Sequence, residues 1–119
     1  MVNTNDALGV IKQMIIDHLK STYKYFALGT GTTPDSSNDT ALENEVFRKE
    51  ITEIEESATS VLFRCYLATT EANGYTLTEF GIFDSASNGR MLFRKVFGGI
   101  TKTEEIEVWF ELEEVVDVA

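Results

Sequence analysis

His18 and Cys65 are the only histidine and the only cysteine in this chain of 119 residues, which makes them the first candidates for chemistry. One histidine and one cysteine cannot supply the ligand sets that usually hold zinc. No G-x-S-x-G motif marks a nucleophile that His18 could activate, so we expect His18 on the surface near a helix C-terminus. Cys65 sits among large apolar residues in a strand-like segment, which predicts a buried, unreactive thiol without a disulfide partner. The sequence therefore predicts a protein that is not an enzyme.

Two loop segments could bind a phosphate or a cation. Gly29 and Gly31 follow an apolar segment, but Pro34 stands where the dinucleotide fingerprint has glycine, and no Gly-Lys-Ser/Thr follows. We expect a sharp turn that leaves a sheet. Residues 35–39 contain two Asp, two Ser and one Asn, and such oxygen-rich loops sometimes hold calcium. Their spacing does not match the EF-hand, and Glu45 would have to reach back as a ligand. A solvated loop with Asx-turns is the favoured interpretation, with a bound ion left open and no cofactor expected.

Carboxylates are concentrated in residues 104–114, where they alternate with apolar side chains. Paired carboxylates can hydrolyse glycosides when they face each other across a cleft. Here several of them share one face of one strand, which indicates a solvated sheet surface. Trp109 lies in the middle of that face, so it is a candidate contact for a partner, unless the N-terminal helix covers it.

The charge balance narrows the possible partners. Twenty acidic and ten basic residues give a net charge of −10, which repels nucleic-acid phosphates and anionic membranes. No apolar run approaches the roughly 20 residues that a membrane span needs, and the N-terminus does not resemble a signal peptide. We therefore expect a protein made in a cytoplasm that binds neither nucleic acid nor membrane.

Residues 5–21 have the apolar spacing of an amphipathic helix. The recurring positions are Leu8, Ile11, Ile15 and Leu19. The apolar stripe is widened by Val10, Met14 and Ile16. Because this stripe is wide for so short a helix, we expect it to be covered by the sheet or by another subunit.

The rest of the chain reads as strands and turns. A T-x-x-E sequence at Thr40 predicts one short helical turn over residues 40–45. Hairpin signals stand at 73–74 and 88–89, and the pair of glycines at 98–99 predicts a strand end. The expected strands are 23–28, 47–55, 59–69, 77–83, 90–97 and 104–114. Together these patterns predict a single, mainly β domain over residues 1–119. Its core, residues 23–116, would be an antiparallel β-sandwich or partly closed barrel of about six strands, behind one N-terminal amphipathic helix.

Several short motifs occur in a recognisable order. Residues 27–34 read Ala-Leu-Gly-Thr-Gly-Thr-Thr-Pro, and residues 39–49 read Asp-Thr-Ala-Leu-Glu-Asn-Glu-Val-Phe-Arg-Lys. Residues 77–84 read Leu-Thr-Glu-Phe-Gly-Ile-Phe-Asp, and residues 91–97 read Met-Leu-Phe-Arg-Lys-Val-Phe. Over residues 23–112 this order resembles tail-fibre and tail-collar-type structural proteins of tailed bacteriophages, prophages and archaeal tailed viruses.

The resemblance implies a structural protein of the virion. It implies a homo-oligomer, with a trimer favoured, that contacts other virion proteins and helps to attach fibres to the tail or baseplate. If these 119 residues are the whole product, they leave no room for a fibre shaft, so we expect an adaptor, baseplate or neck component. The alternatives are a capsid decoration subunit and a carbohydrate-binding module that reads host glycans through Trp109, Tyr66 and Tyr75.

Three charged residues within the motifs have apolar neighbours in the sequence, which suggests a structural role. They are Glu45, Arg48 and Glu79. We expect Arg48 to pair with Glu79 or Glu45 and so to fix the loop onto the sheet. Gly81 would let a neighbouring backbone or aromatic ring approach closely. The alternative is that all three charged residues lie on the surface and contribute less than about 1 kcal/mol each.

Overall fold

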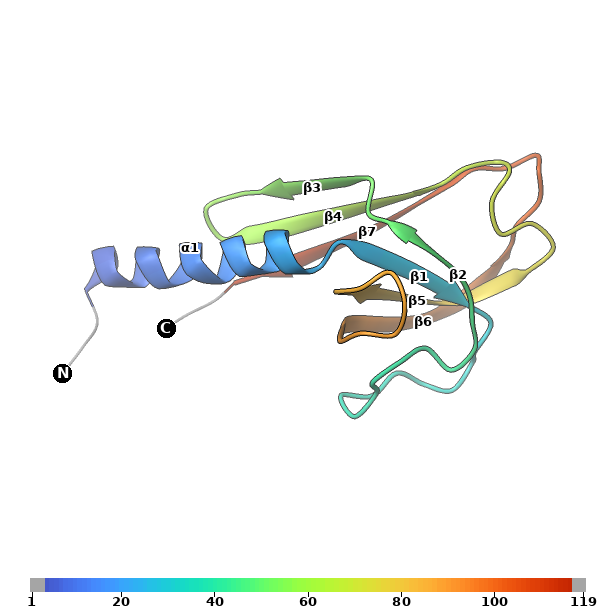
Figure 1. Ribbon diagram of the computed structural model, residues 1–119, viewed down its shortest axis with the longest axis horizontal. Helices are drawn as coiled ribbons and strands as arrows, with labels where there is room; N and C mark the ends of the chain where they lie inside the picture. The colour runs from blue at the N-terminus through green and yellow to red at the C-terminus, as the bar shows by residue number, and fades with distance from the viewer. Residues whose placement is uncertain (1–3, 117–119) are drawn as a thin grey trace.

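The computed structural model describes residues 4–116, which form one helix and seven strands in two antiparallel sheets. The four-stranded sheet has the order β2-β1-β5-β6, with bounds Glu45–Glu50, Tyr25–Gly29, Thr76–Phe83 and Met91–Thr101. The three-stranded sheet has the order β3-β4-β7, with bounds Glu53–Glu56, Ser60–Leu67 and Val108–Val115. The sheets form an open sandwich and not a closed barrel (Figure 1). The predicted mainly β class is confirmed, with seven strands in place of about six.

The core lies between the sheets and follows the period-two patterns of the sequence. On β4, within the strand predicted at 59–69, the buried face consists of Val61, Phe63, Cys65 and Leu67. From the other sheet, Phe26, Leu28, Phe80 and Ile82 belong to the same apolar cluster. The rings of Phe80 and Phe110 stack with their centroids 5.3 Å apart, which joins β5 to β7 across the interior.

The predicted continuous strand over residues 47–55 is wrong. The chain leaves one sheet and joins the other between β2 and β3. The N–H of Ile51 donates to the carbonyl of Lys24, whereas the N–H of the next residue, Thr52, donates to the carbonyl of Arg64. Both halves are extended, but Thr52 forms a bend between them, and the core-packed residues Ile51 and Ile54 are three positions apart. The period-two alternation is therefore broken at the crossing.

The turn predictions had mixed outcomes. Asn88 and Gly89 both adopt positive φ in the β5–β6 hairpin, as predicted. The hairpin predicted at 73–74 is wrong, because this segment joins β4 to β5 in different sheets. The strand end predicted at 98–99 is also wrong, because β6 continues to Thr101. A register shift opposite Leu77 and Glu79 accommodates Gly99 at a φ of 97°.

Helix α1, Asn5–Thr22, begins at an N-cap formed by the side chain of Thr4 and runs one residue beyond its predicted end. Only its C-terminal half packs on the sandwich, so its N-terminal turns project past the sheets (Figure 1). The radius of gyration is accordingly 16.0 Å, against about 13.5 Å for a compact chain of this length. Within residues 4–116, no helix is long and apolar enough to cross a membrane.

Candidate functional site

The loop of residues 30–44 covers the outer face of the four-stranded sheet. The carboxylate of Glu43, a residue of this loop, holds the loop in its conformation. Glu43 accepts hydrogen bonds from the N–H groups of Thr32 (2.8 Å) and Thr33 (3.1 Å), and from the hydroxyl of Thr33. The helical turn predicted for residues 40–45 is therefore wrong. Glu43 bonds to residues ten and eleven positions upstream and does not close a capping box with Thr40.

Glu79 on β5 lies under this loop and is fully buried. Its Oε2 accepts hydrogen bonds from the N–H groups of Gly31 (2.9 Å) and Asn44 (2.8 Å). Its Oε1 accepts from the N–H of Glu43 (2.8 Å) and from Nε of Arg94 (3.0 Å). One carboxylate thus joins both ends of the loop to the sheet.

Arg94 on β6 is the cation that neutralises Glu79, and sequence reasoning missed it. Besides bonding to Glu79, its Nη1 donates to Asp39 (3.0 Å) and its Nη2 to the carbonyl of Thr33 (3.0 Å). Of the two partners expected for Arg48, Glu79 is therefore not the one that it binds. Glu79 holds the loop through Arg94 and the backbone N–H groups instead. The signal for Arg94 was its place as a charged residue within the apolar run of residues 91–97.

Three predicted glycines make room for this arrangement. A Cβ atom on Gly29 would lie 2.5 Å from the carbonyl oxygen of Asn44, and one on Gly31 would lie 2.5 Å from Oε2 of Glu79. A Cβ on Gly81 would lie 2.9 Å from the side chain of Leu42, and 3.1 Å from both the ring of Phe83 and the backbone carbonyl of Phe93, so the predicted close approach of an aromatic ring and a backbone is confirmed. Gly29 ends β1 and Gly31 begins the loop, and both are needed because the Glu79 carboxylate lies so close to their backbone.

The electrostatics of Glu79 favour its ionised form. Burial alone would raise the pKa of Glu79, but the hydrogen bonds from Asn44, Glu43, Arg94 and Gly31 outweigh it and lower the pKa. Glu79 is therefore a carboxylate at neutral pH, paired with a buried guanidinium. All four of these contacts lie within the chain, which makes this a structural ion pair.

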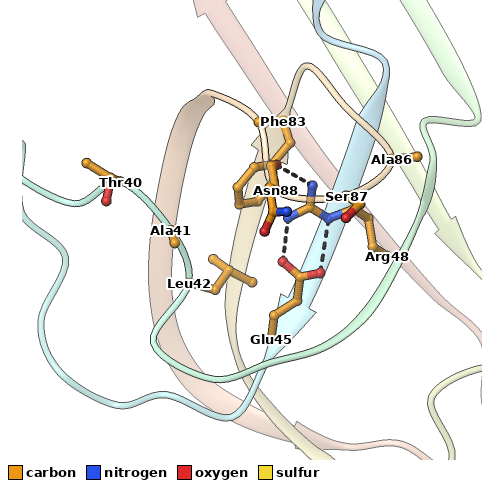
Figure 2. Close-up of a pocket in the computed structure, with 10 residues that line it drawn as sticks. Thr40, Ala41, Leu42, Glu45, Arg48, Phe83, Ala86, Ser87 and Asn88 are labelled. Carbon is orange, nitrogen blue, oxygen red and sulfur yellow. Dashed lines mark hydrogen bonds and ion pairs between the residues drawn. The ribbon is translucent and has the colours of Figure 1, made fainter.

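A cavity of about 510 Å³ lies beside the loop, between Leu42 and the β5–β6 hairpin (Figure 2). Arg48 on β2 projects into it, and the expected pair with Glu45 is present as two bonds of 3.0 and 2.5 Å. Nη1 of Arg48 donates to the carbonyls of Ser85 and Asn88 at 2.8 Å each. The guanidinium also lies 3.8 Å from the centre of the Phe83 ring. Four of its five N–H donors are thereby used, so Arg48 clamps the hairpin and is poorly placed to bind an anion.

The oxygen-rich segment 35–39 is likewise tied to the sheet. Asp39 accepts from the N–H of Ser36 (2.8 Å) and from Arg94, and Asp35 accepts from the N–H of Val96 (3.4 Å). In the part of the chain that the structure describes, no three His, Cys, Asp or Glu side chains gather as a metal site would require. The contacts of Asp39 assign it a structural role.

Trp109 lies on the outer face of the three-stranded sheet, on the other side of the molecule from the loop. Its side chain is 47% exposed, and its ring centre lies 4.9 Å from that of Tyr66. Next to them, Arg64 pairs with Glu111 at 3.0 Å and with two glutamates of β3. Helix α1 packs on the inner face of this sheet, so the helix does not cover Trp109.

Three further side chains that could carry chemistry, those of Cys65, His18 and Lys102, are either buried or bonded within the chain. Burial raises the pKa of the Cys65 thiol to about 12, which fits the predicted unreactive thiol. His18 is exposed in the last turns of α1 and contacts the hydroxyl of Thr22 at 3.4 Å. Lys102 is fully buried and donates to Asn73 (2.8 Å) and to the carbonyl of Thr103 (2.9 Å). Sequence reasoning missed Lys102, because lysine is almost always exposed and no local pattern marks this one.

The predicted site residues therefore fall into three places. Gly29, Gly31, Glu79 and Gly81 meet beneath the loop, Glu45 and Arg48 form the clamp beside it, and Trp109 is remote from both. Neither the known protein families nor the curated proteins compared with the chain match it.

Proposed function

We propose that the chain is a structural protein of a tailed virus particle, serving at the tail or baseplate as an attachment or adaptor module for fibres. The observation that carries the proposal is the convergence of the resembling motifs on one feature. Residues 27–34, 39–49, 77–84 and 91–97 come from separate parts of the chain. They meet in the loop, the Glu79–Arg94 pair and the Arg48 clamp. The motifs that resemble tail proteins thus make up one structural unit.

The use of charge in this unit favours a scaffold over an enzyme. Glu79, Arg94 and Arg48 make their strong hydrogen bonds to groups of the same chain. A catalytic group needs a free position from which it can reach a substrate. These three side chains instead hold loops against a sheet.

The loop also has the properties of a contact surface. Residues 32–38 are exposed, while the segments on both sides are held from below by Glu79 and Arg94. A loop that is already ordered loses less conformational entropy when a partner binds. We therefore assign the contact with another virion protein to this loop.

The test is to find the protein in the particle. An antibody against the purified chain would be applied to density-purified virions and located by immunoelectron microscopy. Labelling at the tail or baseplate is expected. Labelling over the capsid shell would favour the decoration subunit instead, and absence from purified particles would refute a structural role in the virion.

A carbohydrate-binding module is the second candidate, and the open pair of Trp109 and Tyr66 favours it. Sugars stack on exposed aromatic rings, and the neighbouring carboxylates and guanidinium could accept and donate hydrogen bonds to hydroxyl groups. Glycan-array binding that is lost in Trp109→Ala and kept in Val10→Ala, which changes an exposed apolar side chain on α1, would support this candidate. An array without binding by the unaltered chain would exclude the glycans tested.

A further inference from the structure

Helix α1 presents two different faces. One face packs on the chain's own sandwich through Ile16 and Leu19. On the same side, Gln13 and Lys20 both bond to Glu56 of β3. The opposite face, called the outer face here, is apolar and exposed. Its exposed side chains include Val10 (60%), Met14 (66%), Ile11 (36%) and Ile15 (38%).

The outer face has the spacing of a coiled-coil contact. Its central residues are Leu8, Ile11, Ile15 and His18, separated by three, four and three positions. These are the a and d positions of a heptad repeat that begins at Leu8. In this repeat Ile16 is a b position, and Gln13 and Lys20 are f positions, which point away from a coiled-coil axis. Ile16, Gln13 and Lys20, which hold the sandwich, thus point outward, while Leu19 is an e position at the edge of the coiled-coil contact.

We infer that the outer face of α1 is a self-association surface, on which three copies of this chain join their helices, with the sandwiches outside. Leucine at a followed by isoleucine at d, as at Leu8 and Ile11, favours three or four strands over two. The exposed Val10 and Met14 widen the apolar stripe, which a contact with two neighbours would cover better than a contact with one.

The distribution of charge identifies a second copy as the occupant. The chain carries a net charge of −10, but α1 is neutral, because Lys12 and Lys20 balance Asp6 and Asp17. Two strongly acidic molecules repel each other over most of their surfaces, and the helix is where copies can approach without that cost. A membrane is a poorer occupant, because two lysines on an acidic protein give little attraction to anionic lipids.

The shape of the molecule permits this contact. The N-terminal turns of α1 project beyond both sheets, so neighbouring helices can approach them without meeting the sandwich (Figure 1). Eighteen helical residues span about 27 Å at 1.5 Å per residue. That length provides a positions at Leu8, Ile15 and Thr22 and d positions at Ile11 and His18 for each copy.

The experiment measures the solution mass of the full chain by sedimentation equilibrium over a range of concentrations. Three times the chain mass is expected. Ile11→Glu places a charge at a d position and should convert the trimer to a monomer. Ile106→Glu is the matched control, because Ile106 has the same exposed fraction of 36% but precedes β7. It should leave the trimer intact. Circular dichroism would verify that both variants retain the fold.

Each outcome bears on the inference. A monomer at all concentrations would overturn it, and would leave α1 to a different protein or a lipid surface. An oligomer that survives Ile11→Glu would also overturn it, by placing the contact elsewhere, and a dimer would overturn the three-copy arrangement. The inference deepens the proposed virion function and rests on it only for its biological setting. The mass is measured on the isolated chain. Self-association can therefore be refuted while particle labelling supports the virion function, and the virion function can be refuted while the chain is still a trimer.

Discussion

The substitution Glu79→Gln tests whether one buried carboxylate holds the loop of residues 30–44. The carboxylate accepts four hydrogen bonds, two on each oxygen. Glutamine keeps one oxygen and replaces the other by an NH₂ group, so two donors lose their acceptor whichever way the amide turns. A donor left unsatisfied in the interior costs about 1–3 kcal/mol. We therefore expect the free energy of unfolding to fall by about 4 kcal/mol, against a total of about 5–15 kcal/mol for a typical domain.

The pH dependence gives the same substitution a second signature. The pKa of Glu79 is lower in the folded chain than its ordinary value, because the hydrogen bonds and Arg94 outweigh the effect of burial. The ionised group therefore stabilises the fold above the unfolded pKa of about 4.3, and that contribution is lost as pH falls toward the folded pKa. Glutamine does not titrate. The difference in stability between the two proteins should be largest at neutral pH and should shrink as the solution becomes acidic.

The assay is urea-induced unfolding followed by circular dichroism, from neutral pH to the lowest pH at which both proteins still fold. Glu50→Gln, at an exposed position on β2, is the control and should change the free energy of unfolding by less than about 0.5 kcal/mol. A loss below about 1 kcal/mol for Glu79→Gln at neutral pH would refute the reasoning, as would a difference that does not vary with pH.

Three further predictions concern the packing around this unit and the core. Gly31→Ala should destabilise the fold by about 1–3 kcal/mol, because its Cβ would collide with Glu79, whereas Gly98→Ala has open space and should change stability by less than about 1 kcal/mol. Arg48→Met should speed amide hydrogen exchange in residues 84–90 by at least about tenfold, measured by mass spectrometry, because two carbonyls lose a charged donor. The Cys65 thiol should be inert to a thiol reagent in the native protein, with a pKa of about 12, and should react only as fast as the chain unfolds.

The sequence predicted those parts of the fold in which local pattern and tertiary environment agree. Helix α1 and the alternating faces of β4 and β7 were all foreseeable, because one side of each element is more buried than the other. The hairpin at Asn88 was foreseeable because both of its central residues tolerate positive φ. The crossing at Ile51 was not predicted, although the spacing of three between Ile51 and Ile54 breaks the alternation there, because a bulge within one strand would produce the same break.

The sequence predicted most of the residues of the candidate site, but it did not predict which of them pair with each other. Glu79 was named only as one of two expected partners of Arg48, but its partner comes from β6, fifteen residues later. Choosing Arg94 over Arg48 required the strand order, which places β6 next to β5 and places β2 beyond β1. Lys102 was missed for a related reason. Its burial depends on a loop that packs over the end of β6, and no local pattern encodes that contact.

The outer face of α1, the loop of residues 30–44 and the surface around Trp109 fit one arrangement if the helices of three copies join. Helix α1 packs on the inner face of the three-stranded sheet, so its outer face points away from that sheet, as the loop of residues 30–44 does. A three-copy helical contact would therefore turn the loops toward the shared axis and turn Trp109 toward the outside. A loop near a three-fold axis suits an axial partner, such as the base of a trimeric fibre. On this reasoning Trp109→Ala should leave the solution mass unchanged, and a mass that falls in this variant would contradict the arrangement.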